Sequence, residues 1–310
     1  MARQSNSNYV YEFMQSTGMI RASDDTKTRH DYKTLAEEQG LNSSTERSSI
    51  TPLTRSSTIK DYRDTLKDFR GWCKANGFGG DFRTMAGASV TAYLNHKVVD
   101  DGIGRQRINN ICSVINKAGY FGGNDNLNSA VAAFRRDVLP DVPKNPAVSR
   151  AFDSPEAVIK ALGGSPASLA AEIQLRTGLR AENALSFKIN ADGQTVSFIS
   201  KGGMPHPSYD MPKDLIDRAR AFADTKGNVS IMPYRTYCYQ VNTAAKSLGE
   251  CITDRNGKAK VLNSHAFRHC FARNYYAELK TKGFSDIDAK AKVSEALFHS
   301  RLEIVEVYLR

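Results

Sequence analysis

Apolar residues recur with the spacing of a helix through the first half of the chain. Between residues 56 and 76 they lie three or four positions apart, so they would share one helix face. These residues are Ile59, Tyr62, Leu66, Phe69 and Cys73. The same pattern predicts helices over residues 88–101, 105–118 and 128–139. We therefore expect residues 51–140 to form a bundle of four short helices.

Different patterns flank this predicted bundle. Residues 1–50 are polar and rich in Ser, Thr and Asn, with one apolar cluster at residues 9–14 that could form one or two helical turns. This composition favours a partly flexible N-terminal extension. At the far end of the bundle the chain carries Pro140, Pro143 and Pro146. Because proline fixes φ and lacks an amide donor, residues 141–152 are expected to form an extended linker.

Residues 153–310 mix helical periods with one alternating segment. Residues 195–199 alternate polar and apolar side chains, which is typical of a half-buried strand, and the glycines after Lys201 would turn the chain into a returning strand near residue 208. Helices are predicted over 155–162, 168–176, 213–223, 234–248, 265–280 and 285–298, with a last turn or two holding Tyr308. A mixed, mainly α-helical domain with a small antiparallel sheet is expected.

The composition narrows the class of partner. The 310 residues include 43 Lys and Arg against 33 Asp and Glu, a formal net charge of +10. Residues 1–50 hold six basic and seven acidic side chains, so the positive excess belongs to the two predicted domains. This balance favours a polyanion such as a nucleic acid. The five cysteines form no Cys-x-x-Cys pair, and no apolar run is long enough to span a bilayer, which together indicate a cytoplasmic protein without a membrane role.

Candidate chemistry gathers in the last 47 residues, which hold three of the six histidines. His265 and Arg268 are three residues apart and would share a helix face. His299 and Tyr308 are nine residues apart, so they could come from two different short elements around one site. Tyrosine can carry a phosphoryl group covalently, arginine forks onto two phosphate oxygens, and histidine moves protons near neutral pH. Each residue alone is more often a packed or exposed side chain. Together these residue types suit attack on a phosphate.

Further candidate residues precede this segment in a fixed order. Arg180 follows a helix break at Gly178, and Lys201 stands at the tip of the predicted hairpin. The ordered set is Thr177-Gly178-Leu179-Arg180, Lys201, His265-x-x-Arg268-His269, Leu297-x-His299 and Tyr308-Leu309-Arg310. Over roughly residues 55–310 the chain resembles the tyrosine recombinases, the phage-type integrases and their Xer-like relatives. Asn183 stands where this family usually has glutamate, and Phe298 where it has a small residue.

The resemblance implies a two-domain fold, with a helical core-binding DNA domain at 51–140 and a catalytic domain at 153–310. It also implies cleavage and rejoining of DNA without a metal or other cofactor. Tyr308 would attack the scissile phosphate and form a 3′-phosphotyrosyl link, which conserves the bond energy for rejoining. Arg180 and Arg268 would hold the non-bridging oxygens. Lys201 would protonate the leaving 5′-oxygen, His265 would take the tyrosine proton, and His299 would donate a hydrogen bond to the phosphate.

The implied partners are double-stranded DNA, further copies of the chain in a tetramer on DNA, and accessory DNA-bending proteins. The element served would be a mobile one. Phosphate contacts from the helical bundle are expected at Lys97, Arg105, Arg107 and Lys117. Relatives usually carry a tail helix after the tyrosine that docks on a neighbouring subunit. The printed sequence stops two residues after Tyr308, so it predicts no mode of docking.

Other interpretations stay open at this point. A type IB topoisomerase would use the same chemistry to relax supercoils, and a catalytically silent relative would only bind DNA. His265 and His269 lie four apart on a predicted helix, a spacing that can chelate zinc. No carboxylate or thiolate set completes such a site, so no metal is expected.

Overall fold

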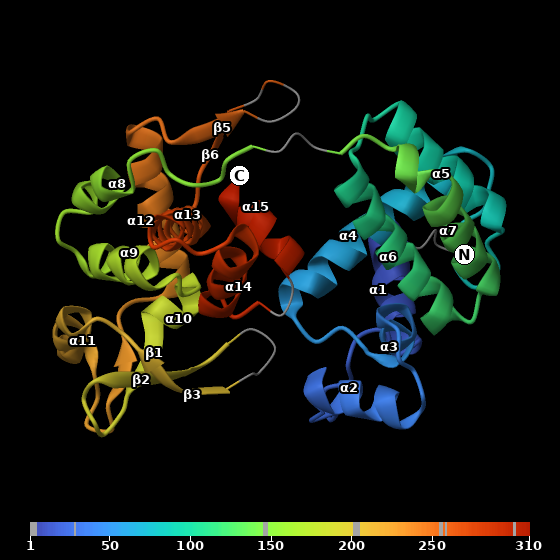
Figure 1. Ribbon diagram of the computed structural model, residues 1–310. Helices are drawn as coiled ribbons and strands as arrows, with labels where there is room; N and C mark the ends of the chain where they lie inside the picture. The colour runs from blue at the N-terminus through green and yellow to red at the C-terminus, as the bar shows by residue number, and fades with distance from the viewer. Residues whose placement is uncertain are drawn as a thin grey trace. The chain divides into compact units, whose positions relative to one another are not determined.

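The computed structural model describes residues 5–27, 29–144, 148–200, 205–253, 257, 259–299 and 302–310. Internal contacts divide the chain into two compact units, Met1–Asn145 and Pro146–Arg310. Each unit has its own hydrophobic core. Figure 1 shows the helices and strands of both units. None of the helices described combines the length and apolar character that a membrane crossing requires.

Among the described residues of the first unit, the elements longer than a single β-bridge are all helices. Its elements are α1 (Asn6–Ser16), α2 (Arg29–Glu38), α3 (Ser44–Ile50), α4 (Ser56–Ala75), α5 (Gly87–Val99), α6 (Arg105–Gly122), α7 (Asp125–Asp137) and the 3₁₀ turn η1 (Leu139–Asp141). The four helices predicted between residues 56 and 139 are confirmed as α4 to α7, with ends that differ by four residues at most.

The α6–α7 pair shows how this unit packs. Ile108, Ile111 and Ile115 of α6 are buried in the core. Because Gly119 has no side chain, α7 can approach closely there, and a Cβ at that position would overlap the side chain of Asn128. Asn128 Nδ2 donates to the carbonyl oxygen of Asn116 at 2.6 Å. Arg135 of α7 also donates to Asn109 Oδ1 and Ser113 Oγ of α6. Apolar burial and side-chain hydrogen bonds together therefore hold this helix pair.

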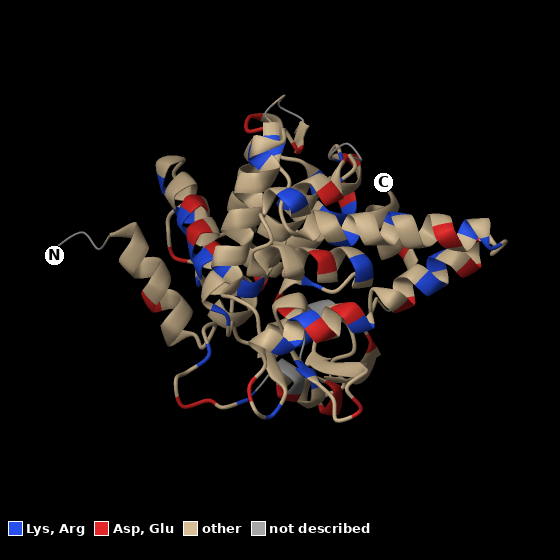
Figure 2. Ribbon diagram, turned by 90° about the vertical axis from the view of Figure 1, so that its left-hand side faces the viewer, with Lys and Arg blue, Asp and Glu red and all other residues tan. Residues whose placement is uncertain are grey.

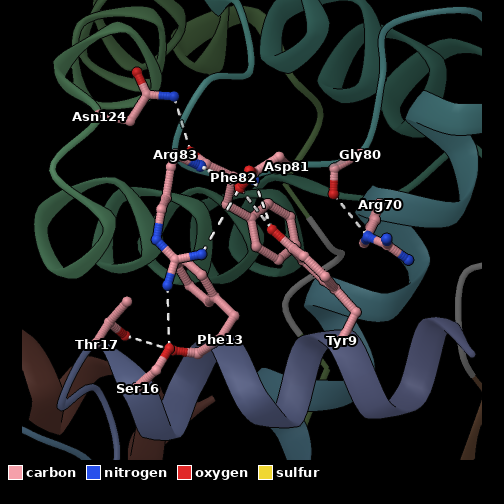
Figure 3. A network of polar contacts seen from close by, with 10 residues as sticks. All are labelled: Tyr9, Phe13, Ser16, Thr17, Arg70, Gly80, Asp81, Phe82, Arg83 and Asn124. Atoms are coloured by element: carbon pink, nitrogen blue, oxygen red, sulfur yellow. Dashed lines mark hydrogen bonds and ion pairs between the residues drawn. The ribbon is translucent and has the colours of Figure 1, made fainter. Parts of the chain in front are cut away.

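Helix α1 extends beyond the one or two turns predicted from residues 9–14. It buries Phe13 and Met14 in the same core as α4 and α6, and Glu12 is its only charged residue (Figure 2). Tyr9 Oη donates to Asp81 Oδ1 at 2.7 Å, and the Arg70 guanidinium lies 3.9 Å from the Tyr9 ring centroid (Figure 3). These partners are more than 60 residues away in the chain, which is why the local pattern gave only a short helix.

The second unit combines helices with two small sheets. Its helices are α8 (Pro155–Ala161), α9 (Pro166–Thr177), α10 (Ala181–Leu185), α11 (Lys213–Ala219), η2 (Arg220–Phe222), α12 (Tyr234–Ser247), α13 (His265–Thr281), α14 (Asp286–Ala296), η3 (Leu302–Ile304) and α15 (Val305–Leu309). Its strands are β1 (Ser186–Ile189), β2 (Thr195–Ile199), β3 (Pro205–Asp210), β4 (Asn228–Ser230), β5 (Cys251–Thr253) and β6 (Ala259–Val261). The mainly helical domain with a small antiparallel sheet is confirmed.

The larger sheet has the order β3-β2-β1-β4, and every neighbouring pair is antiparallel. Val196 and Phe198 of β2 point into the main core, as their alternation predicted. The register of β2 on β3 shifts between these two residues, so the far end of the hairpin pairs Phe198 with His206. Strands β1 and β4 are too short, at four and three residues, for alternation to reveal them.

Helix α13 lies between α9 and the α14–α15 pair (Figure 1). Phe267 and Cys270 face the main core, whereas Ala272 and Leu279 face a second apolar cluster with α14 and α15. Tyr308 belongs to that second cluster and is 6 % exposed. The central position of α13 therefore brings its first turn close to the last helix of the chain.

Candidate active site

The hydroxyl group of Tyr308 lies among three side chains that were predicted from the sequence to be catalytic. Its oxygen is 3.4 Å from Arg268 Nε, 3.3 Å from His299 Nε2 and 3.3 Å from His265 Nε2. These groups come from α15, the first turn of α13, and the loop after α14. The structure thus brings four of the six predicted catalytic residues to one point.

Arg268 is the most enclosed member of the group, with no exposed surface. Its guanidinium donates to the carbonyl oxygens of Gly178 and Leu297, and Nη2 lies 3.3 Å from His299 Nε2. Burial lowers the pKa of Arg268, and the charge of Arg180 lowers it further, while Tyr308 acts in the opposite direction. Arginine stays protonated despite such shifts, so a fixed positive charge faces the tyrosine hydroxyl.

Arg180 is positioned by the break that ends α9. Gly178 caps that helix at φ 68°, and a Cβ there would overlap the ring of Phe271, so glycine is required on both counts. Arg180 then occupies the N-cap position of α10 with a half-buried side chain. Its positive charge lowers the pKa of both Arg268 and His206.

Lys201 lies outside the described residues, as do the two glycines that follow it. The strands leading to that turn are described. Asn183 Nδ2 donates to the carbonyl oxygen of Ile199 at 2.8 Å, two residues before the lysine. Asn183, which stands where the tyrosine recombinases usually have glutamate, therefore supports the end of β2.

His299 is held by the loop that closes α14. Its amide donates to the carbonyl oxygen of Ser294 at 2.8 Å, and Ser294 Oγ donates to the His299 carbonyl oxygen at 2.9 Å. The preceding Phe298 has φ 52°, the only positive value among the described non-glycine residues. A bulky residue in this conformation costs about 1–2 kcal/mol. The place of a small residue is thus taken by a strained aromatic one.

His269 is buried, at 2 % exposed, with its ring centroid 4.5 Å from that of Tyr308. Its Nδ1 atom has no hydrogen-bond partner within the described part of the chain. Burial lowers the pKa of His269 to about 4, and the neighbouring His265 contributes to the shift. His269 is therefore a neutral ring packed against the tyrosine.

Sequence reasoning missed His206, on β3. Its Nε2 atom lies 3.0 Å from Ser200 Oγ, and its ring centroid lies 4.3 Å from that of Phe298. Burial lowers the pKa of His206, and Arg180 lowers it further. The only sequence signal was its place in the strand that returns from Lys201.

The four candidate phosphate contacts of the first unit differ in their surroundings. Lys117 is 4 % exposed, and its ammonium group donates to the carbonyl oxygens of Ser48 and Thr51, so we remove it from the proposed contacts. Lys97 is paired with Asp68 and Asp101 at 2.8 and 2.7 Å.

The two arginines of α6 also differ. Arg105 Nε donates to the carbonyl oxygen of Val142 at 2.9 Å, which joins α6 to the segment after η1. Arg107 is exposed and borders a hollow of about 200 Å³ on the α4–α6 face, together with Asp61 and Asn110. Arg107 is thus the one of the four with the most accessible charge.

A metal site does not emerge from the described residues, where no three His, Cys, Asp or Glu side chains are grouped to hold an ion. His265 and His269 stand with ring centroids 5.3 Å apart and planes at 81°, and both rings border Tyr308.

No protein-family model matches the chain, and no curated protein matches it in sequence. Solved structures do match. A lambda integrase (75–356) dimer bound to a COC′ core site is 17 % identical, with a TM-score of 0.58 over 91 % of this chain and 95 % of that one. The XerH site-specific recombinase on a palindromic difH substrate, a post-cleavage complex, is 13 % identical, with a TM-score of 0.53 over 100 % and 94 %.

The Tn1549 transposon integrase in complex with transposon right end DNA is similar as well, with 12 % identity and a TM-score of 0.52 over 90 % of this chain and 93 % of that one. Identities this low establish a fold rather than an activity. The chain has the tyrosine recombinase fold.

Proposed function

We propose that this protein is a tyrosine-type site-specific DNA recombinase, which cleaves and rejoins DNA through a 3′-phosphotyrosyl intermediate. One observation carries the proposal: the Tyr308 hydroxyl lies 3.3–3.4 Å from Arg268, His265 and His299, in a chain with the recombinase fold. A nucleophile, a fixed cation and two proton carriers are the groups that phosphoryl transfer to tyrosine requires.

In the cleavage step, Tyr308 Oη attacks the scissile phosphorus and its proton passes to His265. The bond from phosphorus to the 5′-oxygen breaks, and Lys201 gives that oxygen a proton. Arg180 and Arg268 hold the non-bridging oxygens while charge builds on them, and His299 donates a hydrogen bond. The incoming 5′-hydroxyl of a second strand reverses these transfers. One phosphodiester bond is exchanged for another at each step, so rejoining needs no external energy source.

The contacts of Arg268 are consistent with this role. The carbonyl oxygens of Gly178 and Leu297 fix the guanidinium within the protein. Its remaining contacts, to Tyr308 and His299, are long, at 3.3–3.4 Å, and a phosphate oxygen could replace them at low cost. The arginine would therefore be oriented before DNA binds. Removal of one such oriented donor typically slows an enzyme by about 10²–10³-fold.

We further propose that the first unit is the core-binding DNA domain and the second the catalytic domain, with residues 141–152 as their linker. The net positive charge outside residues 1–50 and the exposed Arg107 support DNA as the partner. From the resemblance to the tyrosine recombinases we also propose that the active assembly is a tetramer with one subunit on each of four DNA arms, and that the DNA served is a mobile element.

Covalent capture tests the proposal on a mixture of possible target sites. The probe is a pool of nicked duplexes with a randomised core, from which the short cleaved fragment diffuses away. Wild-type protein should retain DNA after denaturation, and sequencing of that DNA should give one preferred core. Tyr308→Phe should retain none.

Two other outcomes would overturn the proposal. Gel shifts without any covalent product from the wild type would indicate a DNA-binding protein without the activity. Covalent products on every core, together with relaxation of a supercoiled plasmid, would indicate a topoisomerase.

A further inference from the structure

One group of aromatic side chains, Phe198, His206, Tyr209 and Phe298, contacts three described segments that lead to candidate catalytic residues: the end of α9, the end of β2 at Ser200 and the loop that holds His299. We propose that this aromatic cluster is a positioning device, which holds the Arg180 turn, the ends of β2 and β3 on either side of residues 201–204, and the His299 loop in register for strand cleavage. The inference rests on the proposed function and extends it, because none of the four side chains belongs to the catalytic set.

The four rings form a continuous contact. The His206 centroid lies 4.3 Å from that of Phe298 and 4.9 Å from that of Phe198. Phe198 and Tyr209 each lie 5.6 Å from Phe298, and 5.6 Å from each other. Pairs at these separations contribute about 0.5–1.5 kcal/mol each beyond the area they bury. The cluster therefore joins β2 and β3 to the loop after α14.

The polar end of Tyr209 leads to the Arg180 turn. Its hydroxyl group donates to the carbonyl oxygen of Thr177 at 2.8 Å, and burial raises the pKa of Tyr209 to about 12, so the phenol keeps its proton. Thr177 ends α9, and Arg180 follows three residues later. A shift of Tyr209 would thus be passed to the backbone that aims Arg180.

The polar end of His206 leads to the lysine hairpin. Its Nε2 atom lies 3.0 Å from the hydroxyl oxygen of Ser200, which directly precedes Lys201. Burial lowers the pKa of His206, and the charge of Arg180 lowers it further, so both effects favour the neutral imidazole. This contact fixes the last described residue before the lysine.

Phe298 supplies the third connection through its own backbone. It directly precedes His299, and its φ of 52° turns the chain so that the ring enters the cluster while His299 faces Tyr308. Each connection is therefore short. Tyr209 and His206 reach their segments through one hydrogen bond each, and Phe298 is the residue next to His299. A general apolar core would not need this set of polar ends.

A change of leaving group separates a positioning role from a general packing role. The probe is the captured duplex, made once with the natural 5′-oxygen and once with sulfur at the same bridging position. A thiolate leaves without protonation, so cleavage of the sulfur duplex does not require Lys201 as an acid. It still requires Arg180, Arg268 and His299.

Ser200→Ala removes the partner of His206 Nε2 without changing a ring. In this variant we expect cleavage of the oxygen duplex to fall about tenfold or more, and cleavage of the sulfur duplex to fall less than threefold. His206→Ala also removes the ring that contacts Phe298, so it should reduce cleavage of both duplexes, and of the oxygen duplex more. Unchanged cleavage in Ser200→Ala, or equal losses on both duplexes in that variant, would overturn the inference.

Tyr209→Phe tests the second connection. The ring stays, but the bond to Thr177 is lost, so cleavage should fall several-fold on both duplexes because Arg180 acts on both. Tyr276→Phe is the matched control, since it removes a phenol–carboxylate bond to Asp286 in the same unit, away from the aromatic cluster. Equal activity in the two variants would contradict the proposed role of Tyr209.

The two proposals fail in different ways. If the wild type forms no covalent product on either duplex, the proposed function fails, and the inference fails with it. If the wild type cleaves both and the variants of the aromatic cluster cleave as it does, the function stands and only the inference falls.

Discussion

Arg268 Nε lies 3.4 Å from the hydroxyl oxygen of Tyr308, although 40 residues separate the two in the chain. Neither side chain is more than 6 % exposed, whereas His265, whose Nε2 atom lies 3.3 Å from the same hydroxyl, is exposed. The proposed nucleophile and the proposed phosphate clamp are therefore in place together, with an accessible proton carrier beside them. Several consequences can be measured.

Arg180→Lys should reduce DNA cleavage about a hundredfold or more. The substitution keeps the charge but loses the planar fork that would hold two phosphate oxygens. Rates of covalent product formation at saturating protein measure the effect. Arg218→Lys, a change of an exposed arginine on α11, is the matched control and should cleave at the wild-type rate. A near-normal rate for Arg180→Lys would mean that this arginine is structural.

Acidification should destabilise the second unit through His269. Its pKa is about 4 in the folded protein and about 6.5 when unfolded, so the unfolded chain binds more protons between these values. The contribution of neutral His269 to stability is fully present above pH 6.5. As the pH drops from 6.5 to 4, the free energy of unfolding should fall by at most about 1.4 kcal/mol per pH unit. Hydrogen exchange of α13 amides measures this loss. His269→Gln should flatten the dependence, and an unchanged slope in that variant would assign the loss to other groups.

Position 298 should reverse the usual preference for alanine over glycine. Phe298→Gly and Phe298→Ala lose the same ring, but only glycine adopts φ 52° without strain. We expect Phe298→Gly to be more stable than Phe298→Ala by about 1 kcal/mol, measured by urea unfolding. Alanine as the more stable variant would show that the loop relaxes to another conformation.

In the first unit, substitutions of the buried Lys117 and the exposed Arg107 should have different effects. Lys117→Met leaves the carbonyl oxygens of Ser48 and Thr51 without their donor, so it should cost about 1–3 kcal/mol of stability. Trp72, the only tryptophan, lies in this unit and reports its unfolding.

Arg107→Ala should leave stability nearly unchanged and weaken DNA binding, with the salt dependence reduced by about one ion. Gel-shift titrations at several salt concentrations measure this change. If Arg107→Ala destabilised the unit and left the salt dependence as it was, Arg107 would be a structural residue rather than a DNA contact.

Much of the architecture was predictable because apolar residues repeat with a helix or strand spacing within single elements. The stripe of α4 and the alternation of β2 are repeated several times within one element, so the expected helix and strand are both present. Helix α1 was underestimated because its stability depends on Asp81 and Arg70, which a local pattern cannot reveal. Lys117 was misjudged for the same reason, since charge alone does not show that α3 covers it.

The site could be predicted as a set of residue types in order, but its connections could not. His265, Arg268, His299 and Tyr308 meet as expected. The contact of His206 with Ser200 depends on the shifted register between β2 and β3, which no spacing rule gives. The sequence shows only that Phe298 replaces the small residue usual in the resembled family. The structure shows that this residue adopts a strained φ of 52°.

The most direct test of the central claim is the chemical nature of the covalent product. Captured complexes would be digested with protease and nuclease, and the peptide that carries a nucleotide would be sequenced by mass spectrometry. We predict a single modified residue, Tyr308, joined to the 3′-phosphate of the cleaved strand, with a free 5′-hydroxyl on the released fragment. A nucleotide on another residue, a 5′-phosphoryl linkage, or a product that persists in Tyr308→Phe would contradict the account.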